Sequence, residues 1–191
     1  MVRYDKGHKD ETRQRILDAA ARQFRARGVS SSGLAGIMAE AGLTNGAFYV
    51  HFESKEDLIR AVLDDALSRR EQVWRKLDGA EGGLSSMIDD YLSPRHRDNP
   101  GRGCPTAAMV AEVAREPAAT RATFTGRVAA VIARIAARLQ GRPAGQREAD
   151  ALAIYALMVG ALQLARAVND AGLSDKILAS GASAARKLAG E

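Results

Sequence analysis

Apolar positions recur every three or four residues along most of the chain, the spacing of one helix face. In the stretch 12–26 this face comprises Ile16, Leu17, Ala20 and Phe24, and Gly28 can end the helix in a left-handed conformation. The same spacing predicts helices over residues 54–78, 84–92, 105–115, 117–139, 146–171 and 174–189. No segment alternates convincingly between apolar and polar residues, so the chain is predicted to be all-α.

Glycine and proline interrupt this pattern at four places. Residues 79–83 and 141–145 are predicted breaks between helices, and Gly172 is predicted to separate the last two. Residues 93–103, SPRHRDNPGRG, are predicted to form an exposed loop.

Residues 33–57 are predicted to form two short helices joined by a tight turn, followed by the start of a third. The first has its apolar face at Leu34, Ile37, Met38 and Ala41. Gly42 can take the left-handed conformation that ends a helix, and Thr44 is a suitable N-cap for the next one. This arrangement is a helix-turn-helix, whose second helix can enter a DNA major groove.

The second short helix offers polar groups on the face opposite its anchor. Phe48 and Phe52 are four residues apart and are predicted to stack on one side, which leaves Asn45, Gly46 and Tyr49 on the other. An asparagine amide can pair with an adenine edge, and glycine lets the backbone approach closely. Tyr49, His51 and Lys55 can donate to phosphates; a generic pair of helices with a solvated face is the alternative.

The segment AGLTNGAFYVHFESKEDL closely resembles the DNA-binding signature of the tetracycline-repressor (TetR) family, with similarity from about Thr12 to Val62. Carried over by position, the resemblance implies that Asn45, Gly46 and Tyr49 contact bases and that Thr44, His51 and Lys55 contact phosphates. Gly33 departs from the Ser or Thr common at that position, which weakens a phosphate contact there. The implied fold is an N-terminal three-helix DNA-binding domain, residues 1–57, and a C-terminal ligand-binding and dimerisation bundle, residues 58–191.

The helix predicted over 146–171 is apolar on most sides and must therefore be buried on most sides. Pairing with a second subunit would bury it. A dimer is also expected from the mechanism, because two recognition helices can read both halves of a palindrome. The predicted interface residues are Leu152, Tyr155, Val159, Leu162, Ile177 and Leu178. The alternative is that both terminal helices face only their own core.

Large apolar and polarisable residues of the C-terminal region are candidates for lining an effector pocket, or are ordinary core residues. They are Trp74, Met87, Tyr91, Cys104, Met109, Phe124, Tyr155 and Met158.

Cys104 precedes Pro105 at a predicted helix start, where the helix dipole favours a thiolate. The surrounding GCP segment resembles a regulatory domain of one branch of the family, some of whose repressors respond to electrophiles or oxidants. A sensing thiol and a small buried hydrophobe are both compatible with this position. The single cysteine and the histidines show no metal-ligand spacing, so neither a metal nor a cofactor is predicted.

Composition and charge indicate in which cellular compartment the protein acts. The 191 residues carry a net charge of +5, and Arg3, Lys6 and Lys9 near the N-terminus form either a DNA-contacting arm or a solvated tail. There is no run of eighteen apolar residues, the N-terminus is too polar for a signal peptide, and one cysteine forms no internal disulfide. These features predict a cytoplasmic protein without a membrane span.

The predicted function is a ligand-responsive transcriptional regulator, a repressor that binds a palindromic operator in double-stranded DNA as a homodimer. An unidentified small-molecule effector would release it. The alternative is a helical small-molecule carrier with a non-functional helix-turn-helix. No nucleophile–base pair, phosphate loop or paired carboxylates indicate an enzyme.

Overall fold

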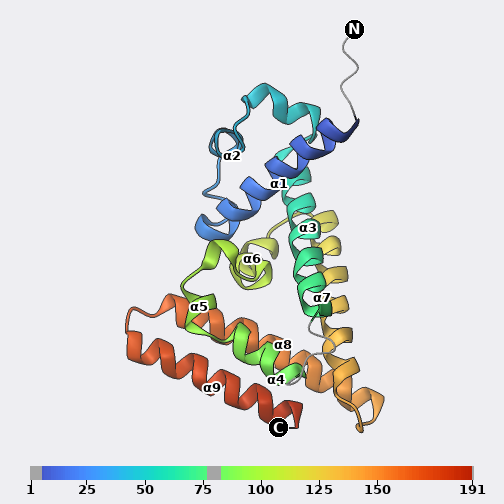
Figure 1. The fold of residues 1–191 in the computed structure, drawn as a ribbon, viewed down its shortest axis with the longest axis vertical. Helices are drawn as coiled ribbons and strands as arrows, with labels where there is room; N and C mark the ends of the chain where they lie inside the picture. Colours follow the sequence, from blue (N-terminus) through green and yellow to red (C-terminus); the bar gives the residue numbers. More distant parts are fainter. Residues whose placement is uncertain (1–5, 77–82, 191) are drawn as a thin grey trace.

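The computed structural model describes residues 6–76 and 83–190, and every regular element in these ranges is a helix (Figure 1). The N-terminal elements are α1 (Lys6–Arg27), α2 (Leu34–Glu40), the 3₁₀ helix η1 (Asn45–Val50) and α3 (Lys55–Lys76). The middle elements are α4 (Gly83–Tyr91), α5 (Pro94–Arg97), η2 (Pro100–Arg102) and α6 (Pro105–Val113). The long C-terminal helices are α7 (Ala118–Arg138), α8 (Ala144–Ala167) and α9 (Ala171–Ala189). The all-α prediction is confirmed.

The first hydrophobic core lies among α1, α2, η1 and the first turns of α3. Its fully buried side chains include those that the helical spacing of residues 12–26 and 34–41 predicted, namely Ile16, Phe24, Ile37 and Met38. Gly28 ends α1 with a φ of +88°, a left-handed conformation that favours glycine. The N-terminal helices therefore pack through the faces that the apolar pattern indicated.

The second core is formed by the end of α3 and by α4, α7, α8 and α9. α8 and α9 run side by side and form the most extensive helix pair in the chain (Figure 1). α3 contributes Leu58 and Leu63 to the first core and Trp74 to the second. The domain boundary after residue 57 remains a prediction, because α3 belongs to both cores.

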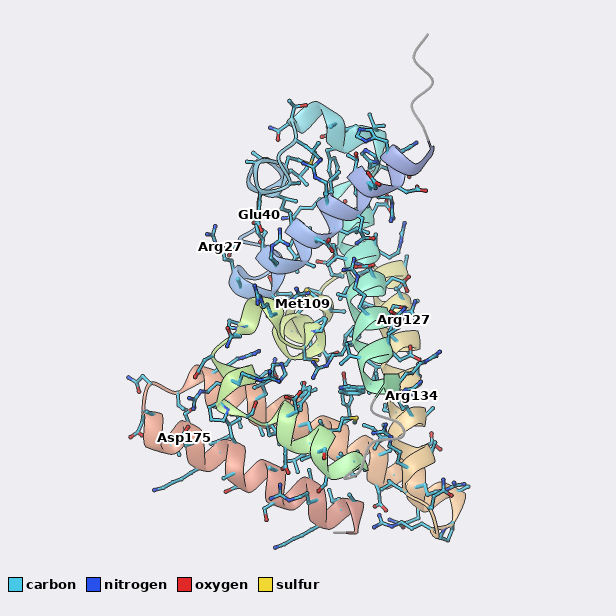
Figure 2. The ribbon with its side chains drawn as sticks, viewed as in Figure 1. Arg27, Glu40, Met109, Arg127, Arg134 and Asp175 are labelled. Atoms are coloured by element: carbon cyan, nitrogen blue, oxygen red, sulfur yellow. The ribbon has the colours of Figure 1, made fainter. Side chains whose placement is uncertain are left out.

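α6 lies between the two cores (Figure 1). Its Met109, labelled in Figure 2, is buried in the first core together with Val113. Its Ala107 is buried in the second core. On the other side of α3, ion pairs hold α7 against it: Arg127 with Asp64 at 2.6 Å and Arg134 with Glu71 at 3.3 Å. The two halves of the chain are thus joined through α3, α6 and α7.

The segment 93–103 contains two short helices, α5 and η2, in place of the predicted exposed loop. Side chains from distant helices hold its backbone: Arg166 Nη2 donates to His96 O at 2.7 Å, and Arg25 Nε donates to Gly101 O at 2.8 Å. Arg97 also pairs with Asp175 of α9 at 2.6 Å (Figure 2). Prolines and glycines exclude a long helix here, but long-range hydrogen bonds fix the short ones.

Several predicted helix boundaries shift, among them the starts of α1 and α9. α1 begins by Lys6, so Lys6 and Lys9 lie on a helix and not on a flexible arm, whereas Arg3 lies outside the described residues. α9 begins before the predicted break at Gly172, because the Asp170 side chain accepts from Leu173 N at 2.8 Å and caps the helix there. The last two residues of the helix predicted over 54–78 and most of the predicted break at 79–83 also lie outside the described residues.

Among the described helices, α8 is long and apolar enough to cross a membrane by length and composition. Within the chain, however, 39% of its apolar window is buried, and it packs against α6, α7 and α9. Its apolar character is therefore explained at least in part as that of a core helix.

Candidate nucleic-acid interface

The turn after α2 has the backbone conformation that its glycine predicted. Gly42 has a φ of +67°, and the N–H of Leu43 donates to Met38 O at 2.9 Å, which closes the end of α2. From α1, Arg15 Nη2 donates to Ala41 O at 2.6 Å. The turn is thus held both by its own backbone and by α1.

The element after the turn, η1, is a 3₁₀ helix of six residues rather than a short α-helix. Thr44 occupies its N-cap position with an extended backbone, φ −78° and ψ 154°, but the Thr44 side chain makes no capping hydrogen bond. The backbone carbonyl of Thr44 accepts a hydrogen bond from Ala47 N at 3.1 Å. The predicted capping role of the hydroxyl is therefore wrong, and the exposed Thr44 side chain is available to a partner.

η1 is anchored by the predicted aromatic pair. The rings of Phe48 and Phe52 are stacked with centroids 5.6 Å apart, and both side chains are at least 98% buried. Tyr49 contacts the edge of Phe48 at 5.2 Å, yet 71% of its surface is exposed. Because the anchor fixes η1 from one side, the opposite side is left open.

Asn45, Gly46 and Tyr49 are all exposed on this open side. A Cβ atom added at Gly46 would have no heavy atom within 4 Å, and its φ is not in the left-handed region. Packing inside the chain therefore does not require glycine at this position. A close approach of another molecule to the backbone would require it.

His51 and Lys55 are less free than the residues of η1. Burial lowers the pKa of His51, and the nearby Lys9 and Arg13 lower it further, so the ring is neutral at pH 7. Its Nδ1 atom is buried without a hydrogen-bond partner among the described residues. Lys55 Nζ donates to Val29 O at 3.0 Å, and an ammonium has two further protons to donate.

Two polar attachments that sequence reasoning missed hold this unit in place. Glu40 of α2 accepts from Gln23 at 2.8 Å and pairs with Arg22 at 2.7 Å, which fixes α2 on α1 (Figure 2). Glu112 of α6 accepts from the N–H groups of Val29 and Ser30, each at 2.9 Å. No local spacing signals these contacts, because the partners are 17 to 83 residues apart.

The residues predicted to line an effector pocket are packed side chains. Phe124 is half-buried, and the other seven are at least 95% buried in one of the two cores. These seven are Trp74, Met87, Tyr91, Cys104, Met109, Tyr155 and Met158. Tyr155 Oη donates to Thr106 Oγ1 at 2.8 Å. Four clefts among the described residues are lined by other side chains.

Cys104 is buried, with 1% of its surface exposed, and it occupies the N-cap position of α6. Its backbone N–H donates to His96 Nε2 at 2.8 Å, and His96 Nδ1 lies 2.7 Å from Tyr91 O. The ring is therefore a neutral tautomer that accepts through Nε2 and donates through Nδ1. Among the described residues, no group of three potential ligands could hold a metal ion.

Of the six residues predicted for a subunit interface, four are buried in the chain's own core: Tyr155, Val159, Leu162 and Leu178. Leu152 is 48% exposed and Ile177 is partly buried. A shallow groove of about 650 Å³ runs along α8 and α9, lined by the exposed Leu164 and Leu173 and by the partly buried Leu157, Gly160 and Ile177. The helical spacing identified both helices, but the packing of α8 against α9 determines which face stays open.

Comparison with known proteins agrees with this arrangement. A family model described as "Bacterial regulatory proteins, tetR family" matches residues 16–62. The probable HTH-type transcriptional regulator ArpR of Pseudomonas putida is 43% identical over 84 residues, which are 41% of this chain and 40% of ArpR. The HTH-type transcriptional repressor BepR of Brucella suis is 40% identical over 95 residues, 50% of this chain and 41% of BepR.

The chain thus spans about two fifths of the length of these curated relatives, whereas a solved structure matches almost throughout. A TetR transcriptional regulator from Chloroflexus aurantiacus superimposes with a TM-score of 0.76 at 26% identity, over 92% of this chain and 94% of that one. Residues 16–62 therefore match the tetR family of bacterial regulatory proteins, and the chain as a whole has the fold of a TetR transcriptional regulator.

Proposed function

We propose that this protein is a ligand-responsive transcriptional repressor of the TetR type, which binds a palindromic operator as a homodimer in the cytoplasm. The observation that carries the proposal is the open face of η1. Thr44, Asn45 and Tyr49 are exposed together on a segment whose opposite side is anchored by a buried aromatic pair. A carrier or an enzyme has no use for a rigid, outward-facing polar segment of this kind.

Each residue of this face has a proposed role. Asn45 and Tyr49 contact base edges, and Gly46 allows the backbone close to the groove. Thr44, His51 and Lys55 contact phosphates; neutral His51 does so as a hydrogen-bond donor and Lys55 as a cation.

A second copy of the chain would cover the apolar groove along α8 and α9. Leu164 and Leu173, 59% and 48% exposed, are large apolar residues that a partner surface would bury. Gly160 would allow the helices of two copies to approach closely. A two-fold dimer would present two copies of η1 to the two halves of a palindrome.

Effector binding would reach η1 through α6 and α3. Glu112 of α6 holds the backbone between α1 and α2, and Lys55 at the start of α3 binds the same loop at Val29. Burial alone would raise the pKa of the Glu112 carboxyl, but hydrogen bonds from Ser30 and Val29 outweigh it, so the pKa is lowered and the charged form is held. A displacement of α6 would therefore move the loop that precedes the DNA-binding helices.

Selection of bound sequences from a random double-stranded DNA pool at two salt concentrations tests the proposal. An enriched inverted repeat is expected, with affinity that falls as salt rises because phosphate contacts release counterions. Binding without enrichment, sensitive to salt alone, would contradict operator recognition. The operator obtained in this way then serves to screen effectors. Because the GCP segment resembles a branch in which some repressors respond to electrophiles or oxidants, modification of Cys104 is monitored in the same screen.

A further inference from the structure

An arginine-rich cleft of about 450 Å³ lies where α1, α3 and the segment from η2 to α6 meet. Five arginines line it, together with small apolar walls such as Ala21, Ala66 and Val73: they are Arg22, Arg25, Arg69, Arg70 and Arg102. A neighbouring cleft of about 310 Å³ shares Arg70 and Arg102. The volume is that of sites that hold small organic molecules.

The two carboxylates of the first cleft share one arginine as their ion-pair partner. Asp18 and Asp65 both pair with one guanidinium, that of Arg69, at 2.9 and 3.0 Å. Arg22 pairs with Glu40 outside the cleft at 2.7 Å. The other three arginines of the cleft take part in none of these ion pairs.

Arg25, Arg70 and Arg102 have no carboxylate partner among the described residues. Arg25 donates its Nε proton to Gly101 O, and burial lowers its pKa. The Arg70 guanidinium lies 5.5 and 5.6 Å from the ring centroids of Trp74 and Tyr91. Its Nε atom is buried and has no hydrogen-bond partner in the described part of the chain. Arg102 lines the cleft and is exposed to solvent.

The five arginines outnumber the two aspartates of the cleft, so the cleft stays positively charged even when the pair of Arg22 with Glu40 is counted. Like charges repel each other, and a buried guanidinium N–H without an acceptor is costly. An anion in the cleft would reduce the repulsion between the arginines and would give the unpaired guanidinium N–H an acceptor. A planar carboxylate fits the fork of a guanidinium through two parallel hydrogen bonds, and the alanine and valine walls suit an organic group beside it.

We propose that the cleft binds a small organic carboxylate and that this anion is the effector of the regulator, an inference that rests on the function proposed above. Arg25 lies on α1, Arg70 on α3 and Arg102 on η2. A bound carboxylate ties the DNA-binding helices to the C-terminal half of the chain. It changes operator affinity to the extent that it binds better to one arrangement of these elements than to the other.

Isothermal titration of the full-length protein with benzoate, at constant ionic strength, tests the site. Benzamide is the neutral control of the same shape, and inorganic phosphate distinguishes an organic from an inorganic anion. Benzoate is expected to bind, benzamide is not, and Arg102→Gln and Arg70→Gln are each expected to weaken benzoate binding about tenfold or more. Arg102 makes no side-chain bond within the described residues, so its substitution leaves the fold intact even if loss of Arg70 disturbs the aromatic cluster.

Arg121→Gln removes the same charge from the exposed surface of α7 and is expected to leave benzoate affinity unchanged. Equal weakening by Arg121→Gln, equal binding of benzamide, or no benzoate binding would overturn the proposal, as would phosphate binding alone. Operator affinity is measured separately with and without benzoate. Specific operator binding without benzoate binding would overturn only the carboxylate site, whereas benzoate binding without any operator would overturn the regulator itself.

Discussion

The chain has two exposed surfaces of opposite character at opposite ends of the molecule (Figure 1). The open face of η1 is polar, and η1 is anchored on its opposite side by the stacked rings of Phe48 and Phe52. The groove along α8 and α9 is apolar and is built from residues on two long helices, among them Leu164 and Leu173. The polar face is specified by a few consecutive residues, whereas the apolar groove exists only after two helices have packed.

The largest expected effect comes from placing a charge in the apolar groove. Leu164→Asp would bury an uncompensated carboxylate between subunits, at a cost of several kcal/mol, so the dimer dissociation constant should rise by at least about a hundredfold. Sedimentation equilibrium measures it. Ala119→Asp adds the same charge to the exposed part of α7 and should leave the dimer unchanged; a Leu164→Asp protein that remains dimeric would place the interface elsewhere.

The second effect separates DNA recognition from assembly. Tyr49→Ala should weaken operator binding by about tenfold to a hundredfold, the range expected for loss of a base contact, while the dimer stays intact. Val50→Ala, at an exposed neighbouring position, is the matched control. Fluorescence anisotropy with the selected operator and sedimentation on the same samples give both readouts, and unchanged binding by Tyr49→Ala would refute the site assignment.

The third prediction concerns pH and the segment between the two surfaces. Burial lowers the pKa of His96 to about 4, although the hydrogen bond to Tyr91 O opposes this. Because the unfolded chain binds the proton from pH 6.5 downward and the folded chain does not until about pH 4, stability is present above pH 6.5 and is lost as the pH falls through this window. The loss should reach up to about 3 kcal/mol.

Urea unfolding at pH 7.0 and 4.5 measures this loss. His96→Gln keeps an acceptor for the Cys104 N–H and does not titrate, so its stability should change less between the two pH values. The same pH dependence in both proteins would contradict the neutral, buried His96.

The smallest effect is expected at the attachment between α6 and the N-terminal helices. Glu112→Gln keeps the shape but removes the charge that accepts from Val29 and Ser30, and should cost about 1–2 kcal/mol of unfolding free energy. Glu148→Gln, a substitution of the same type on exposed α8, should have no measurable effect. If the two variants are equally stable, Glu112 does not link α6 to the loop.

The sequence predicted the helices and the turn of the DNA-binding unit well, because these depend on local spacing and on one glycine with a positive φ, Gly42. It did not predict that η1 is a 3₁₀ helix or that Glu112 and Arg25 hold loops far away in sequence, since nothing local distinguishes a bonded from a solvated charge. The subunit interface itself remains a prediction, and two of its proposed residues, Tyr155 and Leu162, proved to be buried within the chain's own core. Which face of an apolar helix stays open depends on packing between distant segments.

The position of α6 between the two cores has a consequence for how the protein unfolds. Met109 and Val113 complete the core of the N-terminal helices, while Ala107, on the same helix, belongs to the other core. Neither core can lose α6 without exposing apolar surface in both, so the two should melt in a single cooperative transition. A fragment that ends at residue 57 or 76 would lack these side chains, and any chimaera that grafts the DNA-binding helices onto another regulator must supply replacements for Met109 and Val113.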